Sequence, residues 1–163
     1  MVNSVICGLS PGSRHAANPN LLVVAVSTGR IELYTLDFED PNIPHLSHAG
    51  SYEEATESTL LLSLAVDINI TPCMATLSTG EALIFDLNDG VPNILHSWKA
   101  HNLEAWCSAW KTSDTVMTGG DDGLLKLWDL RDLRTPQSVC RRCLDSIRLL
   151  NIDIMLVWCR FSL

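Results

Sequence analysis

The sequence contains few aromatic residues, few basic residues and no long apolar run. Aromatic residues make up 6% of the 163 positions, although five of them are tryptophan. Nineteen acidic against eleven basic residues give a formal charge of −8. This charge argues against a nucleic-acid-binding surface, which needs clustered Lys and Arg. No segment approaches the roughly 20 apolar residues of a membrane span, and no signal peptide is evident. We therefore expect a cytoplasmic protein that binds neither nucleic acid nor membrane.

Several chemical signatures are also missing. The six cysteines are scattered, and without a secretory signal we expect them to be reduced thiols. Cys140 and Cys143 form a lone C-x-x-C pair with no second pair and no histidine at zinc-ligand spacing, so we interpret them as incidental, with a metal or redox site as the alternative. A G-x-S-x-G elbow is absent, which leaves a serine-hydrolase mechanism without support. We expect no metal and no cofactor.

A segment that is repeated three times and aligned on a glycine is the main feature of the sequence. The copies are Val23–Asp37, Met74–Asn88 and Met117–Arg131, with glycines at positions 29, 80 and 123. In each copy an apolar run leads into a polar turn that holds the glycine and then into a second apolar run, which predicts a β-hairpin. The glycine supplies the positive φ that a tight hairpin turn requires.

One hairpin cannot bury its own face. Hairpins that recur every 40 to 50 residues predict four-stranded blades packed radially in an all-β fold, the β-propeller. Short apolar segments before the hairpins, at Asn3–Cys7, Leu60–Ile68 and Ala105–Trp110, are expected to be the first strands of the blades. The region Asp37–Thr59 is polar, acidic and holds two prolines, so we expect it to be a long surface loop.

Composition changes near Pro136. Residues 1–135 carry a net charge of −10 and residues 136–163 a net charge of +2, with half of the cysteines and no glycine in the second stretch. We predict a partial propeller over residues 1–135 and an atypical tail over residues 136–163, either a truncated or misspliced product or a genuine helix or strand pair. Closed propellers have 4–8 blades, so three legible blades leave two sheet edges open and predict self-association or aggregation.

The third copy is the most regular and carries a set of polar residues. His101 precedes Trp128-Asp129, and Thr118 and Asp122 lie between them. This spacing resembles the WD-repeat signature, which implies a buried network: Asp122 holds the imidazole of His101, Thr118 bridges, and the Trp128 indole N–H donates into it. Buried polar groups need such partners. We interpret His101 with Asp122 as a structural clasp rather than a catalytic acid–base dyad.

Two further motifs in this copy are not required by a generic blade. Glu104-Ala-Trp106 follows the histidine, and Gly119-Gly-Asp-Asp122 fills the turn. Over Ser97–Arg131 this combination resembles the WD-repeat diphthine methyl ester esterase (diphthine methyltransferase) family of diphthamide biosynthesis, of which the chain looks like a truncated member. The resemblance implies a hydrolase that removes the methyl ester of methylated diphthine on translation elongation factor 2. A non-catalytic WD-repeat scaffold for protein–protein interaction is the alternative.

Three residues of these motifs are the candidates for function. Glu104 and Asp121 could act as the base that activates the attacking group, or attract a cation. Trp106 could pack against the trimethylammonium group of diphthine, a contact worth ~0.5–2 kcal/mol. Each candidate has a structural alternative: Trp106 as a core strand residue, and Glu104 and Asp121 as rim or turn residues.

Overall fold

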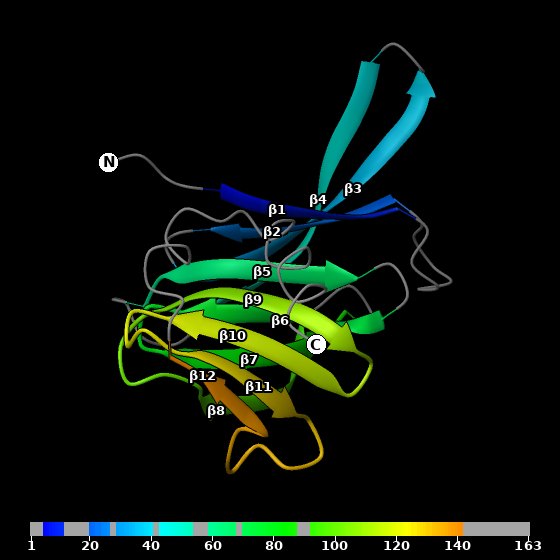
Figure 1. Cartoon of the computed structure of the whole chain (residues 1–163). Helices are drawn as coiled ribbons and strands as arrows, with labels where there is room; N and C mark the ends of the chain where they lie inside the picture. The colour runs from blue at the N-terminus through cyan, green and yellow to red at the C-terminus, as the bar shows by residue number, and fades with distance from the viewer. Residues whose placement is uncertain are drawn as a thin grey trace.

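The chain forms three antiparallel sheets of four strands each in the computed structural model (Figure 1). The structure describes residues 5–11, 20–26, 29–40, 43–53, 59–67, 70–87 and 92–141. Within these ranges every regular element is a strand. The predicted all-β class and the four-stranded blades are therefore confirmed.

Each sheet is a meander in which consecutive strands are neighbours, and we refer to the three sheets as blades 1, 2 and 3. Blade 1 contains β1 (Val5–Pro11), β2 (Asn20–Val26), β3 (Arg30–Asp40) and β4 (Ile43–Glu53). Blade 2 contains β5 (Leu61–Asp67), β6 (Ile70–Leu77), β7 (Glu81–Asp86) and β8 (Asn93–Lys99). Blade 3 contains β9 (Ala105–Thr112), β10 (Thr115–Gly120), β11 (Leu125–Asp129) and β12 (Ser138–Cys140).

The three repeated segments form the central hairpins of the blades, as predicted. Their glycines lie in the turns with φ of 83°, 84° and 74° at Gly29, Gly80 and Gly123. Each glycine N–H donates to the carbonyl three residues earlier, at 2.9–3.0 Å. A β-carbon at Gly80 would lie 2.4 Å from the carbonyl oxygen of His101, so the turn also needs glycine because the segment that enters the next blade passes close to it.

The described residues 37–40 and 43–53 of the region expected to be a loop form strands instead, so this prediction was wrong for them. β3 continues to Asp40 and β4 returns as the fourth strand of blade 1. The side chains of His45, Leu46 and His48 on β4 are exposed, because an outermost strand is paired on one side only. Such a strand tolerates polar residues and proline, so its composition resembles that of a loop. Figure 1 shows β3 and β4 extending beyond the rest of the sheet.

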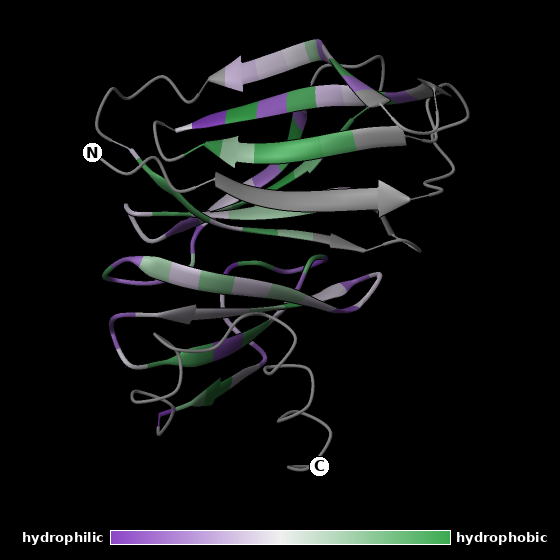
Figure 2. Ribbon diagram, turned by 90° about the horizontal axis from the view of Figure 1, so that it is seen from above, coloured by the Kyte–Doolittle hydropathy of each residue, from purple (hydrophilic) through white to green (hydrophobic). Residues whose placement is uncertain are grey.

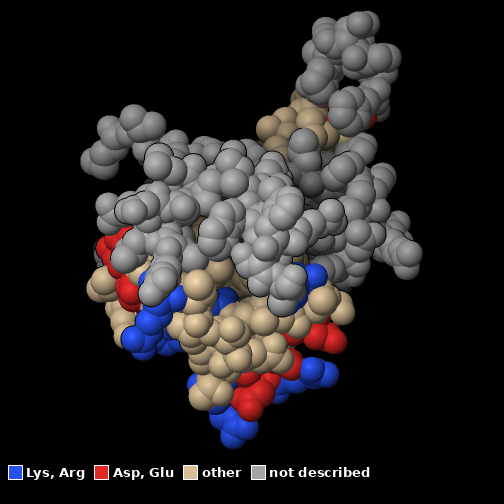
Figure 3. All heavy atoms as spheres, in the orientation of Figure 1, with Lys and Arg blue, Asp and Glu red and all other residues tan. Residues whose placement is uncertain are grey.

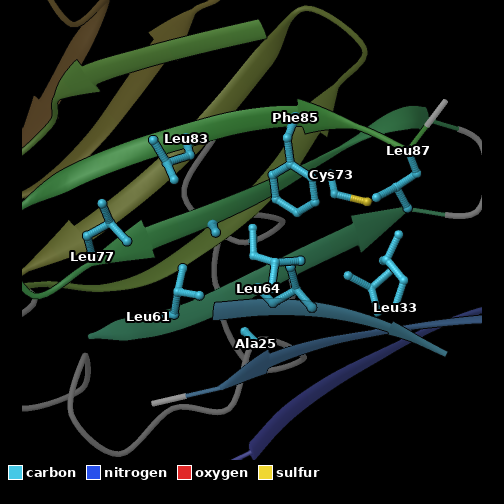
Figure 4. Packing of buried hydrophobic residues seen from close by; sticks show 12 residues of the cluster. Ala25, Leu33, Leu61, Leu64, Cys73, Leu77, Leu83, Phe85 and Leu87 are labelled. Atoms are coloured by element: carbon cyan, nitrogen blue, oxygen red, sulfur yellow. The ribbon is translucent and has the colours of Figure 1, made fainter. Parts of the chain in front are cut away.

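The hydrophobic core lies between successive blades. Twelve buried residues of blades 1 and 2, among them Ile31, Leu33 and Phe85, form one cluster, part of which Figure 4 shows at close range. A second cluster joins blade 2 to blade 3 and includes Trp110 and Trp128. In Figure 2 green, hydrophobic stretches lie on the coloured parts of the strands, and much of the coloured connecting turns is purple and hydrophilic. Each blade is therefore stabilised mainly by burial against its neighbour.

Blade 3 continues past residue 135, where the partial propeller was expected to end. β12 pairs with β11 through Leu125–Cys140, Lys126–Val139 and Leu127–Ser138. The first residues of the predicted tail therefore supply the outer strand of this blade. The tail from residue 142 onward, including Cys143, lies outside the described residues.

Candidate functional site

The four polar residues of the WD-type pattern meet between β10, β11 and the segment before β9. Nδ1 of His101 lies 2.8 Å from Oδ1 of Asp122, and Nε2 lies 2.8 Å from Oγ1 of Thr118. The indole N–H of Trp128 donates to the same threonine oxygen at 2.8 Å. His101 and Thr118 are almost completely buried. The structure thus brings together all four residues that the sequence pattern linked.

Donor and acceptor chemistry fixes the direction of these hydrogen bonds. The carboxylate of Asp122 only accepts, so Nδ1 of His101 carries the proton. Nε2 then accepts from the Thr118 hydroxyl, which in turn accepts from Trp128. Burial lowers the pKa of His101 below its ordinary value, and the hydrogen bond to Asp122 opposes this only in part. The imidazole is therefore neutral at pH 7 and acts as a structural clasp.

The partners of Asp122 hold its carboxylate in the charged form. Burial alone would raise the pKa of Asp122, but hydrogen bonds from His101 and from the backbone N–H groups of Asn102 and Leu124 outweigh it, so the pKa lies below its ordinary value. Nζ of Lys126 lies 3.7 Å from Oδ2 and donates to the carbonyl of Ala100 at 2.6 Å. The sequence did not indicate Lys126 as a partner of Asp122. Its spacing of two residues from Trp128 predicts only that both side chains lie on the same face of β11.

The second glycine of the pair before Asp121, Gly120, has a steric reason. A β-carbon at Gly120 would lie 2.6 Å from Cγ and Nδ1 of the His101 ring and 2.9 Å from the carbonyl oxygen of Glu104. No side chain larger than hydrogen fits there without displacing the histidine. Gly120 is thus required by the clasp, not by the chemistry of a ligand.

The candidates Glu104 and Asp121 are neighbours at one end of blade 3. The backbone N–H of Asp121 donates to the carbonyl of Glu104 at 2.9 Å, and both residues are half-buried. This backbone hydrogen bond places both acidic residues on the same rim of the blade, at the turn between β10 and β11. This rim, made of Leu103, Glu104, Trp106 and Asp121, is the candidate functional site and is called the blade 3 rim below.

Trp106 is 40% exposed, so the structural alternative that it is a core strand residue was wrong. The cause is a β-bulge: Gly119 pairs with Cys107 and Gly120 with Ala105, which leaves Trp106 without an opposite residue. A bulge redirects the side chain of its extra residue and is common beside functional sites. The regular apolar pattern Ala105–Trp110 could not reveal it, because a bulge depends on the partner strand.

Blade 2 provides an internal comparison for the blade 3 rim. Its β5–β6 pair has the same bulge at Leu62, and the N–H of Ser78 donates to the carbonyl of Leu60 at 2.9 Å, as Asp121 does to Glu104. The backbone is therefore equivalent, while the side chains differ: Glu104, Trp106 and Asp121 stand where blade 2 has Leu60, Leu62 and Ser78. Because blade 2 forms the same structure with other residues, these three side chains are not dictated by the fold.

Among the described residues, no group of three or more His, Cys, Asp or Glu side chains could hold a metal ion. The same part of the chain contains no helix long and apolar enough to cross a membrane. Burial raises the pKa of Cys73 to about 12, which makes this thiol unreactive at neutral pH. Figure 3 shows acidic and basic side chains interspersed on the described part of the face in view.

Comparison with curated proteins identifies relatives of this chain. It is 32% identical over 114 residues to diphthine methyltransferase of Schizosaccharomyces pombe and 30% identical over 119 residues to the diphthine methyltransferase homolog of Dictyostelium discoideum. The chain is a relative of the diphthine methyltransferases. The matches cover 69% of this chain but only 33% and 31% of those proteins, so it spans about a third of their length. A 70-residue match to the Mus musculus diphthine methyltransferase is 40% identical and covers 40% of this chain and 14% of that protein.

These relatives confirm the resemblance that the motifs around His101 indicated. No family model matches the chain. Solved structures confirm the fold: the C-terminal WD40 domain of Sif2 superposes with a TM-score of 0.64 over 85% of this chain and 37% of that one, at 12% identity. A chain of the mitotic checkpoint complex gives 0.59 over 76% and 35%, at 16% identity. The fold is therefore a partial WD-repeat propeller.

Proposed function

We propose that this protein hydrolyses the methyl ester of methylated diphthine on translation elongation factor 2, in the cytoplasm. The observation that supports the proposal is the blade 3 rim, where Trp106 is 40% exposed two residues after Glu104, whose backbone carbonyl accepts a hydrogen bond from Asp121. The names of the relatives connect this family to diphthine. Diphthine carries a trimethylammonium group and a carboxyl group, so a site for its ester needs to recognise a cation and activate water.

Trp106 supplies the first of these two requirements. A quaternary ammonium has no N–H and cannot be recognised by hydrogen bonds. It binds instead to the face of an aromatic ring, with Trp the most favourable, and nearby carboxylates add electrostatic attraction. The bulge that exposes Trp106 makes an indole surface accessible on the same rim as Glu104 and Asp121.

Glu104 and Asp121 supply the second requirement. One carboxylate accepts a proton from a water molecule as the water oxygen bonds to the ester carbonyl carbon. The bond from that carbon to the methoxy oxygen then breaks, and methanol leaves with a proton. The products are methanol and the free carboxylate of diphthine, and water is the only other reactant.

The test uses elongation factor 2 that carries methylated diphthine. The chain is incubated with it, and the modified peptide is followed by mass spectrometry. We expect the loss of one methylene unit together with the release of methanol. Removal of the general base, by Glu104→Gln or Asp121→Asn, should slow this reaction about 10²–10⁴-fold for the carboxylate that acts as base. Asp114→Asn, in the exposed turn at the other end of blade 3, is the matched control and should leave the rate unchanged.

A protein scaffold remains the competing function, and the exposed side chains of Leu60 and Leu103 favour it, at 44% and 51% exposure. Large apolar side chains at a rim are typical of protein contacts. Stable binding of elongation factor 2 without any change in its mass would contradict the esterase and support the scaffold.

A further inference from the structure

Exposed apolar side chains gather at one end of blades 2 and 3. Leu60, Leu103 and Trp106 are 44%, 51% and 40% exposed. The other large apolar side chains that are exposed within the described ranges lie one on each outer strand, at Leu46, Leu95 and Val139. Single exposed apolar residues are normal on a protein surface, whereas a group of them marks a contact site.

The turn between β6 and β7 fixes the positions of Leu60 and Leu103. The backbone N–H of Leu60 donates to Oγ of Ser78, and its carbonyl accepts from the N–H of Ser78, both at 2.9 Å. Two residues later, a β-carbon at Gly80 would collide with the carbonyl oxygen of Leu103. Both leucines are therefore held against the same tight turn of blade 2.

The first strands of the two blades bring Trp106 to the same end. The hydroxyl oxygens of Ser63 on β5 and Ser108 on β9 lie 2.8 Å apart, and Figure 1 shows these strands side by side. Leu60 precedes Ser63 by three residues, and Trp106 precedes Ser108 by two. Leu60, Leu103 and Trp106 thus lie on one surface, which is called the apolar rim below.

The fold does not dictate a leucine at position 103. Thr59 lies against Gly29 where the chain enters blade 2, as Leu103 lies against Gly80 where it enters blade 3. Thr59 is only 3% exposed, whereas Leu103 is 51% exposed. Because an exposed leucine adds little to the stability of the chain itself, its side chain is available to a partner.

The apolar rim also lies apart from the contacts between blades. The buried clusters that join the blades lie between the faces of their sheets, and they contain none of its three residues. The apolar rim is instead at the start of β5 and β9. Packing of one blade on the next therefore leaves it accessible.

We propose that the polypeptide of the substrate docks on the apolar rim, with its apolar side chains against Leu60 and Leu103 and its trimethylammonium group against Trp106. The inference rests on the proposed function for the identity of this polypeptide, the segment of elongation factor 2 that carries methylated diphthine. A modified side chain reaches a site only together with the backbone that carries it, so polypeptide must lie beside the site. The acidic residues Glu104 and Asp121 on the same rim complement the positive charge of diphthine.

The proposal divides recognition between two groups of residues. Leu60 and Leu103 contact the polypeptide and act whether or not its histidine is modified. Trp106 contacts the trimethylammonium group and acts only on the modified form. Binding measurements with the two forms of elongation factor 2 separate these contributions and do not depend on turnover.

Isothermal titration calorimetry of the chain with each form of elongation factor 2, one with methylated diphthine and one with unmodified histidine, tests this division. We expect both forms to bind, the modified form more tightly. Leu60→Ser and Leu103→Ser should each raise the Kd of both forms about three- to tenfold, because roughly half of each side chain is left to be buried. Trp106→Ala should weaken the modified form more than the unmodified form.

Leu95→Ser, at a side chain of β8 that is 42% exposed, is the matched control and should leave both Kd values unchanged. Far-ultraviolet circular dichroism verifies that each variant is folded. If a serine variant is unfolded, the milder Leu60→Ala or Leu103→Ala takes its place. Kd values that the substitutions at Leu60 and Leu103 leave unchanged, or no binding of either form to the unmodified chain, would overturn the docking surface.

Release of methanol from the modified form is measured in parallel and separates this inference from the proposed function. Binding that depends on Leu60 and Leu103 without any methanol would overturn the esterase and leave the docking surface standing. Methanol release with a KM that both substitutions leave unchanged would overturn the docking surface and leave the esterase standing.

Discussion

Gly120 lies against the imidazole ring of His101 so closely that a single methyl group does not fit between them. A β-carbon at this glycine would be 2.6 Å from two ring atoms. We expect Gly120→Ala to displace His101 and to lower the free energy of unfolding by about 1–3 kcal/mol, the usual cost of overpacking. Urea denaturation measures the change. Lys111→Ala, at an exposed site on β9, should stay within about 0.5 kcal/mol of the unmodified protein, and equal values for the two variants would contradict the steric account.

The hydroxyl of Thr118 connects His101 to Trp128, because it forms a hydrogen bond with each of them. Thr118→Val keeps the shape of the side chain but leaves the indole N–H of Trp128 and Nε2 of His101 without their shared partner. We expect a loss of about 1–3 kcal/mol in the free energy of unfolding, the cost of leaving buried polar groups unsatisfied.

Thermal and urea unfolding of Thr118→Val provide that measurement. Thr135→Val, the same change at an exposed residue, serves as the control. If both substitutions cost the same, the hydrogen bonds to Trp128 and His101 do not stabilise the blade.

The clasp predicts that acid weakens the fold in a defined pH window. Burial lowers the pKa of His101, so the unfolded chain takes up this proton near the ordinary value of 6.5 while the folded protein does so only at lower pH. Stability is therefore fully present above pH 6.5 and decreases as the pH falls below it. The lowered pKa of Asp122 adds a further loss only below its ordinary value of 3.8.

Unfolding free energies between pH 8 and pH 5 measure this dependence. His96→Gln, at an exposed histidine on β8, should keep the acid-induced loss, whereas His101→Gln should remove most of it. Stability that is unchanged or higher at pH 5 than at pH 8 would show that His101 is not held neutral by the fold.

Much of the architecture could be predicted from residues whose roles are local. A glycine such as Gly80 marks a hairpin turn because the turn itself requires positive φ, and the apolar runs on either side follow from it. The His101–Asp122 pairing was likewise recognised from the spacing of a known repeat.

Other features depend on contacts that spacing does not encode. The outer strand β4 (Ile43–Glu53) resembles a loop in composition because only one of its edges is paired. The exposure of Trp106 comes from a bulge that exists only when β9 meets β10. The backbone hydrogen bond between Asp121 and Glu104 joins two segments that are not adjacent in the sequence. Only the structure therefore shows that the two residues lie close together.

The central claim is that the blade 3 rim acts on diphthine while the equivalent rim of blade 2 does not. A matched pair of substitutions at the two bulges, Trp106→Ala and Leu62→Ala, tests it in the methyl-ester assay on elongation factor 2. The account predicts that Trp106→Ala reduces methanol release about two- to thirtyfold, as expected for losing an aromatic contact of ~0.5–2 kcal/mol to a cation, and that Leu62→Ala retains the full rate. Equal rates for the two variants, or no methanol from the unmodified chain, would contradict it.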